Sequence, residues 1–545
     1  MKNQTILGSI IAVGIGATIA GGLYFRQQPA PTDNNLTSTT LRVNTATQLE
    51  SLDSTKYSTS IAGSTISNLI DGLYGPNATG KTIPVISNGH PTISKDKKVY
   101  TFTLRHFTWS NGSPVTADDF VYAWQRLADP KTNSRNASNI DLLVNGAAVR
   151  KGTKPVSALG VKALGKYKLR VSLIAATPVL DEILSQTSFM PINRAYATKQ
   201  GTRYGTTSTR ILTCGPFRIT GWSGEKDNRW AFIRNPTYAA QTRVTLEQIQ
   251  FSVAKDNQVA ATKLEKGQLD YTAISSDTIP KYTGHQRLKR MSTTTGAYLF
   301  FNVKDSVTGN VHLRRAIATA FDKHLLTTGK LGNGSVSLNG LIPAGLNSSP
   351  SGTDFRAKNG DLLPYDASYA RSEWQKAKQS LKKSSLTVTL NIADTDEAKL
   401  VGQFLKGQLE HNLPGLSVKV VSTTLAKRVA LESAGKYQIA FATWSPSTSD
   451  PYGLLSFNQT DSPLNISGFS DATYDKMLTT ITNELGVADK KRWRTTLEAE
   501  KYVMTQKVPT VGVYQSGLAY LLSDRVAQFP ILKTGVINYE YVRMK

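Results

Sequence analysis

Hydrophobic and polar positions in the second half of the chain alternate between the spacing of helices and the spacing of strands. Helical spacing occupies residues 367–381 and 397–411, and short apolar runs occupy residues 386–392, 416–421 and 439–442. Strands that alternate with helices are typical of a mostly parallel sheet, whose ligand crevice lies at the carboxyl ends of the strands. Trp444 comes just after the last apolar run, so we expect it at such a strand end.

The loop after Trp444 offers hydroxyl and main-chain groups but no charge until Asp450. Residues 445–449 read Ser-Pro-Ser-Thr-Ser, and the Asp450-Pro451 pair closes the loop. An indole and main-chain polar groups at the mouth of a strand suit a cleft that holds a polymer by its main chain. A tryptophan that fills a hole in the core is the alternative interpretation.

A strand, a turn and a helix are expected in the first half of the chain. Residues 99–104 alternate as a half-buried strand, and Thr116 is placed to cap a helix that ends near Pro130. Asp118 and Asp119 then lie in the positive first turn of that helix, which explains them without a catalytic role. Further strands are expected at residues 296–303, 510–515 and 520–523.

The N-terminal segment predicts export. Residues 6–25 carry no charge and would span about 30 Å as a helix, which is enough to cross a bilayer. A signal peptide cut near residues 18–20 and an uncleaved anchor are both compatible with this pattern. Residues 27–40 are rich in Pro, Asn, Ser and Thr and are typical of a flexible tether.

The net charge of +25, from 64 Lys and Arg against 39 Asp and Glu, favours an anionic neighbour such as an anionic membrane or cell wall. The basic residues are spread along the chain without a polybasic block, which argues against nucleic acid as the partner.

Metal, disulfide and nucleotide sites find little support in the sequence. Cys214 is the single cysteine, and the six histidines lack metal-binding spacings, so we expect no metal and no cofactor. Gly75 to Thr82 match the phosphate-loop pattern GxxxxGK[ST], but no helix pattern follows before Thr116. We therefore interpret this stretch as a glycine-rich turn.

Several stretches, in this order, resemble the oligopeptide- and dipeptide-binding proteins of ABC importers, which are the extracellular solute-binding proteins of family 5. The longest is residues 100–130, YTFTLRHFTWSNGSPVTADDFVYAWQRLADP. The other stretches are Leu52-Asp53, Asp71-Gly72-Leu73, Cys214-Gly215-Pro216-Phe217, Arg234-Asn235-Pro236-Thr237-Tyr238, Lys266-Gly267-Gln268-Leu269-Asp270, Phe301-Asn302, Arg315-Ala316-Ile317, and Trp444 with Asp450-Pro451. The resemblance covers roughly residues 41 to 545.

The resemblance implies an α/β, two-lobed periplasmic-binding-protein fold of type II (the Venus-flytrap fold) with an extra inserted domain. Lobe I would comprise residues 41–75, 187–290 and 515–545, domain II residues 76–186, and lobe III residues 291–514. It also implies an extended peptide bound between the lobes through its main chain, by strands at Ser58-Thr59-Ser60 and around Trp444. The expected ligand-binding residues are Ser58, Thr59, Ser60, Tyr298, Asn302, Thr443, Trp444, Ser445, Ser447 and Asp450.

The chain departs from the family pattern in three places. Ser447 stands where peptide binders of the family usually have an aspartate that pairs with the peptide α-ammonium, and an ammonium buried without a carboxylate is costly. Ala239 follows Tyr238 where the family commonly has Trp. The lipid-attachment cysteine usual in Gram-positive relatives is also missing, since residues 20–22 read Ala-Gly-Gly.

The leading interpretation is a binding protein without enzymatic activity. It would be a monomer at the outer face of the cytoplasmic membrane, anchored by residues 6–25 or released after cleavage. It would deliver short peptides to permease subunits that work with cytoplasmic ATPases. Ser447 leaves open a relative for N-blocked or signalling peptides or for a non-peptide solute. A surface protein that binds wall polymers and a nucleotide hydrolase are weaker alternatives.

Overall fold

The computed structural model describes residues 39–483 and 490–545. The expectations about export, anchoring and the tether therefore fall almost wholly outside the described residues. Within the described ranges, none of the helices is both long and apolar enough to cross a membrane.

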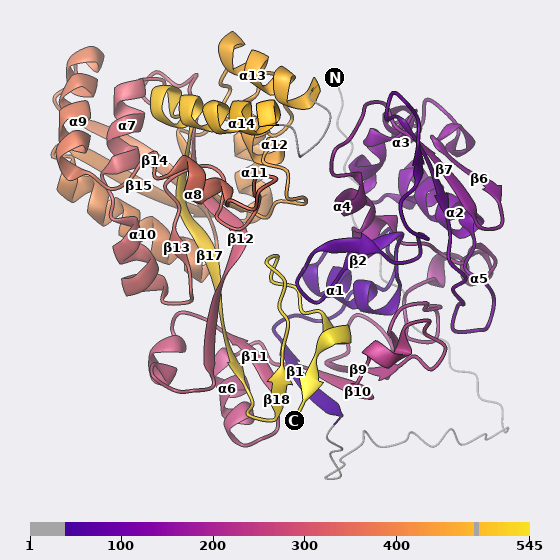
Figure 1. Cartoon of the computed structure of the whole chain (residues 1–545). Coiled ribbons are helices and arrows are strands. Elements are labelled where there is room, and N and C mark those ends of the chain that lie inside the picture. Colours follow the sequence, from indigo (N-terminus) through magenta and orange to yellow (C-terminus); the bar gives the residue numbers. More distant parts are fainter. Residues whose placement is uncertain (1–38, 484–489) are drawn as a thin grey trace, which may run out of the picture. The chain divides into compact units, whose positions relative to one another are not determined.

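The described chain is built around one mixed sheet of eleven strands (Figure 1). Their order is β15-β14-β16-β12-β17-β11-β1-β10-β9-β8, with β13 beside β17. The strands are β1 Thr40–Thr45, β8 Phe217–Thr220, β9 Arg229–Arg234, β10 Gln248–Val253, β11 Tyr271–Ile274, β12 Leu288–Phe301, β13 Val336–Ser337, β14 Leu386–Ala393, β15 Leu416–Thr423, β16 Ile439–Trp444 and β17 Thr510–Leu522.

The parallel pairing expected from residues 386–442 is confirmed for β14, β15 and β16, but the sheet as a whole is mixed. Strand β14 runs parallel to β15 and β16, and β1 runs parallel to β10 and β11, but the remaining pairings are antiparallel. The reason is the pair formed by β12 and β17. At 14 and 13 residues they are the longest strands described, and each continues from one part of the sheet into the other (Figure 1). The two strands expected at residues 510–515 and 520–523 are a single strand, β17.

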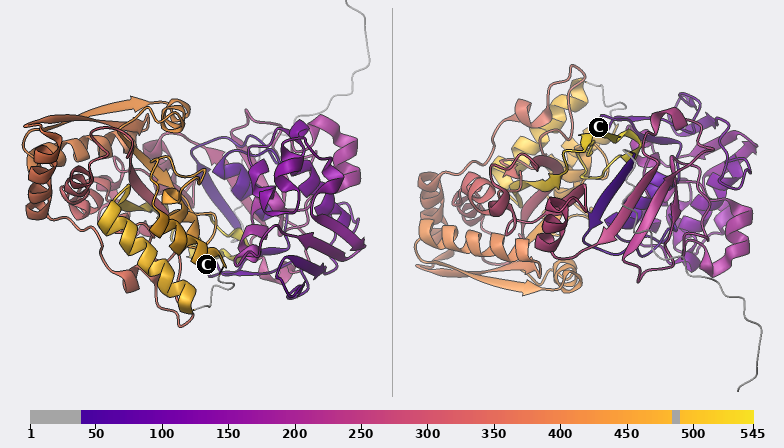
Figure 2. Two further views of the ribbon diagram at one scale, coloured as in Figure 1. Left: turned by 90° about the horizontal axis from the view of Figure 1, so that it is seen from above. Right: turned by 90° about the horizontal axis from the view of Figure 1, so that it is seen from below.

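One hydrophobic core lies around the β14–β16 end of the sheet. It includes Trp374, Phe441 and Tyr514, which are almost completely buried. Two views in Figure 2 show the orange and yellow helices gathered at this end. These helices are α7 Val311–Thr319, α8 Phe355–Asn359, α9 Ala367–Leu381, α10 Asp396–Asn412, α11 Leu425–Ser433, α12 Tyr452–Leu455, α13 Ala472–Asn483 and α14 Lys490–Tyr502.

A second core joins β1 and β8–β10 to a smaller four-stranded sheet of order β4-β5-β7-β6. This part contains β2 Tyr74–Pro76, β3 Thr82–Pro84, β4 Thr92–Ile93, β5 Val99–Thr103, β6 Val161–Gly165 and β7 Lys168–Ser172. Its helices are α1 Ser60–Leu69, α2 Ala117–Ala128, α3 Gly146–Arg150, α4 Leu180–Leu184 and α5 Arg194–Gln200. Helix α6, Asn257–Glu265, lies with a small third cluster near β11, and β18 Val526–Gln528 pairs with β19 Arg543–Met544.

The helix predicted after Thr116 is confirmed as α2. The Thr116 N–H donates to the Asp119 carboxylate over 2.9 Å, and the indole of Trp109 donates to the same group over 3.1 Å. Phe120 and Trp124 are fully buried on its apolar face. The acidic residues of this first turn therefore serve the helix, as the sequence predicts.

The phosphate-loop match at Gly75 to Thr82 is a β-hairpin, in agreement with the turn interpretation. Strands β2 and β3 pair directly, and the Asn77 carboxamide oxygen accepts from the N–H groups of Thr79 and Lys81 over 3.0 Å each. Main-chain N–H groups that a phosphate would need are thus used within the turn.

Alanine substitutions at two glycines test how closely the chain packs against β17. A Cβ at Gly512 of β17 would lie 2.1 Å from the carbonyl oxygen of Gly340, and 2.7 Å from that of Leu338. We expect Gly512→Ala to lower the free energy of unfolding by about 3 kcal/mol, because backbone atoms must move to admit the methyl group. Thermal unfolding followed by circular dichroism measures the change.

Gly407→Ala is the matched control. Gly407 lies within α10, and a Cβ there would meet no atom within 4 Å. An alanine should therefore raise stability by about 1 kcal/mol through helix propensity alone. Equal melting temperatures for the two variants would contradict the packing of β17 described above.

Candidate ligand-binding site at the end of strand β16

Strand β16 is buried where it begins and exposed where it ends. Ile439, Ala440 and Phe441 are buried, whereas Thr443 and Trp444 are exposed. The Trp444 indole packs edge-on against the Phe457 ring, with centroids 5.3 Å apart, and still has 39% of its surface exposed. A large aromatic side chain that is held in place and yet exposed is suited to contact a ligand, which favours the cleft over the core interpretation of Trp444.

The loop after Trp444 is fixed by side chains from within the same half of the sheet. Ser445 and Thr295 share a hydrogen bond of 2.6 Å between their hydroxyls. Asn347 donates to the Ser449 carbonyl over 3.0 Å. These contacts hold the loop against β12 and leave the Ser447 side chain exposed.

Asp450 has a structural role instead of the expected ligand contact. Its side chain is buried, and Arg492 donates to both of its carboxylate oxygens over 2.9 and 2.7 Å. One of these oxygens also accepts from the Tyr452 N–H over 3.1 Å. A buried carboxylate paired in this way cannot serve as a free anchor for a second cation, so Asp450 supports the loop.

The strand expected at Ser58-Thr59-Ser60 is absent, because these residues form the entrance to α1. The Thr59 hydroxyl caps the helix by accepting from the Ala62 N–H over 3.3 Å. The Glu50 carboxylate accepts from the N–H groups of Ser58 and Thr59 over 2.9 and 2.8 Å. Burial raises the pKa of Glu50, but these hydrogen bonds outweigh it and hold the pKa below its ordinary value.

Tyr298 lies near Trp444, because both rings pack against Phe457 with centroids 5.7 and 5.3 Å away, whereas Asn302 is not brought to this site. The Tyr298 side chain is fully buried, which raises the pKa of its phenol, and its hydroxyl donates to the Leu341 carbonyl over 2.9 Å. Asn302 donates to the carbonyls of Gly435 and Tyr437 over 3.0 Å each. In the β12–β16 ladder Trp444 faces Gly296 and Ile439 faces Phe301, so Asn302 lies beyond the far end of β16, about 20 Å away.

Two residues that sequence reasoning missed, Glu182 and Gln186, reach the loop from α4 and the turn after it. Ser449 donates to the Glu182 carboxylate from its N–H over 2.6 Å and from its hydroxyl over 2.5 Å. Gln186 Nε2 donates to the Ser447 carbonyl over 3.3 Å. No local pattern marks either residue, because the partners lie more than 260 residues away.

The electrostatic environment of Glu182 is unfavourable for its charge. Burial raises the pKa of this carboxyl most, and the nearby Asp181 and Asp450 raise it further, against the two hydrogen bonds from Ser449. Burial and the neighbouring carboxylates therefore favour protonation of the group that ties α4 to the loop, although its hydrogen bonds from Ser449 oppose it.

The described residues hold no group of three or more His, Cys, Asp and Glu side chains that would suit a metal ion. Cys214 is buried, and burial together with Asp71 raises the pKa of its thiol well above the ordinary value. It is therefore a packed residue, as the sequence predicts, and not an activated nucleophile.

Comparisons with known proteins agree with this fold. The model of the bacterial extracellular solute-binding proteins, family 5 middle region, matches residues 81–465. A dipeptide-binding protein of Lactococcus lactis is 27% identical over 518 residues, covering 88% of this chain and 92% of its own.

Two solved structures are similar over nearly their whole length. One is Listeria monocytogenes OppA bound to peptide, with 30% identity and a TM-score of 0.75, covering 93% of this chain and 99% of its own. The other is the substrate-binding domain of an oligopeptide ABC transporter from Bacillus anthracis, with 31% identity, a TM-score of 0.76 and the same coverage. These similarities confirm the periplasmic-binding-protein fold of type II, and the chain belongs to the bacterial extracellular solute-binding proteins of family 5.

Proposed function

We propose that this protein is the extracellular substrate-binding subunit of an ABC importer, which captures short peptides between two lobes and delivers them to a membrane permease. The relatives named above bind dipeptides and oligopeptides, which supports peptide as the ligand class. In this proposal the protein is a monomer without enzymatic activity, held at the outer face of the membrane by residues 6–25 or released after their cleavage.

The observation that carries the proposal is the free edge of strand β16. On one side, β12 pairs with β16 along its whole length up to Trp444. On the other side, among the described strands, β14 pairs only with Ile439 and Ala440. The main chain of residues 442–444 is thus an open strand edge beside an exposed indole, which is the arrangement that accepts an extended peptide as an added strand.

The division into lobes extends this proposal. We assign residues 41–75, 187–290 and 515–545 to lobe I, residues 76–186 to domain II, and residues 291–514 to lobe III. The two separate hydrophobic cores support a boundary between lobe III and the rest. The contacts of Glu182 and Gln186 with the loop after Trp444 then lie between domain II and lobe III, at the mouth of the proposed cleft.

Ser447 favours a second candidate within the same class, a protein for N-blocked or signalling peptides or for a non-peptide solute. Its hydroxyl carries no charge, and its carbonyl already accepts from Gln186. Asp450, the next carboxylate along the loop, is neutralised by Arg492. A free α-ammonium therefore finds no unpaired carboxylate among the loop residues 445–450.

The proposed function predicts that the purified protein binds peptides. Native mass spectrometry of the purified protein should reveal co-purified peptides, and a random peptide library should raise its melting temperature, because a ligand that binds only the folded state stabilises it. Trp444→Ala should weaken binding about tenfold or more, as expected for an exposed aromatic anchor.

Tyr365→Ala provides the control, since Tyr365 is similarly exposed but belongs to the segment before α9. It should leave peptide affinity unchanged. A protein that carries no peptide and whose melting temperature the library does not change would contradict the proposed function.

The second prediction concerns the peptide amino terminus. We expect the protein to bind free and N-acetylated forms of one peptide with affinities within about threefold, because the loop lacks an unpaired carboxylate. Ser447→Asp should create a preference for the free amine, and Ser447→Ala is the control that adds no charge. Calorimetric titration of both peptide forms measures the ratio, and a strong preference of the wild type for the free amine would exclude the N-blocked alternative.

The third prediction concerns the pH dependence of closure through Glu182. Because the closed arrangement raises the pKa of this carboxyl, its contribution to closure is complete below the ordinary pKa. That contribution is lost as the pH rises through the raised value. Fluorescence energy transfer between labels on domain II and lobe III should therefore report a closed fraction that declines with rising pH in this window.

Glu182→Gln keeps a carbonyl acceptor and an amide donor for Ser449 but removes the titration. This variant should stay closed across the same pH range. Asp181→Asn should move the decline to lower pH, because it removes one of the charges that raise the pKa of Glu182. A decline that is unchanged in both variants would assign the pH dependence to other groups.

A further inference from the structure

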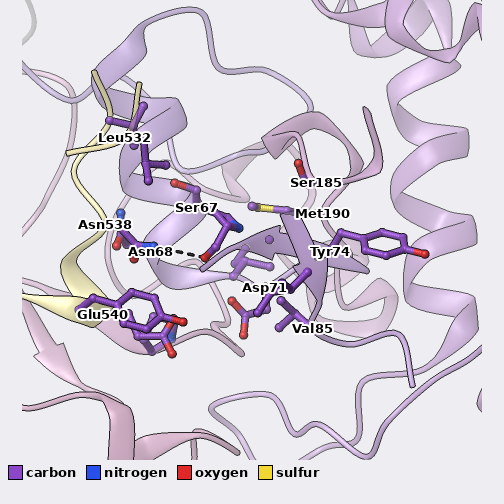
Figure 3. Close-up of a pocket in the computed structure, with 18 of the residues that line it drawn as sticks. Ser67, Asn68, Asp71, Tyr74, Val85, Ser185, Met190, Leu532, Asn538 and Glu540 are labelled. Carbon is purple, nitrogen blue, oxygen red and sulfur yellow. Dashed lines mark hydrogen bonds between the residues drawn. The ribbon is translucent and has the colours of Figure 1, made fainter. Parts of the chain in front are cut away.

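A cavity of about 70 Å³ lies beside α1 and the β2–β3 hairpin, and no residue of β16 or of the loop after Trp444 lines it. It is enclosed by the C-terminal end of α1, the β2–β3 hairpin, the segment after α4, the loop between β9 and β10, and residues 532–541 near the C-terminus (Figure 3). A single water molecule needs roughly 10–15 Å³ of such space, so the cavity admits a small molecule of several atoms.

One carboxylate oxygen in this cavity has no partner. Asp71 lies two residues beyond the end of α1, and its Oδ2 is shielded from solvent and accepts no hydrogen bond within the described chain. The Tyr238 hydroxyl acts on the same carboxyl as a hydrogen-bond donor and lowers its pKa. In Figure 3 the Asp71 side chain projects into the cavity between Tyr74 and Glu540. An unsatisfied carboxylate oxygen in such a place is costly, which indicates that a donor or cation belongs there.

The charged groups around Asp71 leave it without a counter-ion. Glu540 faces it from the C-terminal segment, but Glu540 already accepts from the Tyr238 hydroxyl over 3.4 Å and lies 3.6 Å from the Arg243 guanidinium. Arg243 therefore balances Glu540, and the Asp71 carboxylate, when it is ionised, has no cation paired with it among the described residues.

The titration of Asp71 reflects the same imbalance. Burial, followed by the charge of Glu540, raises the pKa of Asp71 to about 8. Tyr238 and Arg243 act in the opposite direction. The other titratable groups near Asp71, Tyr541 and the Cys214 thiol, both have a raised pKa and carry no charge at neutral pH.

One part of the remaining wall is apolar and is lined by Ile70, Val85, Met190, Leu532 and Ile537. The polar side chains of Ser67, Asn68, Ser185 and Asn538 also line the cavity. A bare metal ion would leave this wall in contact with nothing, and the described residues offer too few metal-binding side chains. An ammonium group with a short alkyl chain matches both walls, because it places donors on the carboxylates and methylene groups on the apolar side chains.

We propose that this cavity is a binding site for a small primary alkylammonium group, which is held between Asp71 and Glu540 with its alkyl chain against Ile70 and Met190. The site is separate from the proposed peptide edge of β16 and does not depend on it. The same chemistry is carried by a free amine and by a lysine side chain of a peptide, and the experiment separates these sources.

Calorimetric titration with ethylammonium chloride tests the proposal, with sodium chloride at equal ionic strength as the reference. A ligand of three non-hydrogen atoms is limited to roughly millimolar affinity. Binding requires the Asp71 carboxylate, whose pKa is raised to about 8, so each bound ion should release a proton at pH 7 and progressively less as the pH rises above the pKa. Titrations in two buffers of different ionisation enthalpy measure this release.

Asp71→Asn keeps the size of the side chain but removes its charge, so ethylammonium affinity should fall at least tenfold and proton release should disappear. Glu225→Gln, which changes an exposed carboxylate outside the cavity lining, should behave as the wild type. A parallel titration compares the tripeptides Ala-Lys-Ala and Ala-norleucine-Ala. An advantage of the lysyl peptide that Asp71→Asn abolishes assigns the site to a peptide side chain, and its absence assigns the site to free amines.

Two results would overturn the inference. One is the absence of ethylammonium binding beyond the sodium chloride reference, which would mean that the cavity holds only water. The other is equal ethylammonium affinity in the wild type and Asp71→Asn. Because peptide binding is measured separately in each variant, failure here leaves the function proposed for β16 untouched.

Discussion

The pairing of β12 with β17 is the interaction on which the rest of the molecule depends. Strand β12 contributes Tyr298 and strand β17 contributes Tyr514 to the core around β14–β16. At their other ends, Leu288 of β12 and Leu521 of β17 belong to the cluster near β11 and α6. Strand β12 also pairs with β16 on its other side, which places Gly296 beside Trp444 and so fixes the end of β16. Close approaches at Gly512 and Gly517, where a Cβ would meet the backbone of residues 338–340 and 333–335, show how tightly the surrounding chain packs on this pair.

Local features of the fold could be predicted from the sequence, because their causes lie within a few residues. The Thr116 cap, the turn at Gly75 to Thr82 and the burial of Cys214 are examples. Pairing between distant strands could not be predicted in the same way. Residues 516–519 read Ser-Gly-Leu-Ala, which suggests a break between two strands, yet β17 runs through them because β12 and β11 supply its partners.

The candidate site likewise combines features with local causes and features that depend on residues distant in the sequence. Exposure of Trp444 follows from its place after an apolar run, whereas the roles of Asp450, Tyr298 and Asn302 depend on partners distant in sequence, such as Arg492, Leu341 and Tyr437. Thr59 is a residue type that commonly caps helices, so a helix start at Ser60 could have been predicted from the sequence. The strand expected at this place came from the resemblance to the family instead. Glu182 had no signal at all, since its only distinction is to meet Ser449 across the fold.

The ladder between β12 and β17 shifts register at two places, and the larger shift has a mechanical consequence. Between the pairs Ser292–Gly517 and Gly296–Gln515, residues 293–295 of β12 stand opposite Ser516 alone. Side-chain bonds replace the regular ladder there, from Thr293 to the Ser516 carbonyl and from Gln515 to the Thr293 carbonyl. Continuous ladders resist bending and sliding, so compliance is concentrated in these few residues. A bend of the β12–β17 pair is therefore easiest at residues 293–295, between Leu288 in the cluster near α6 and Ala297 in the core around β14–β16.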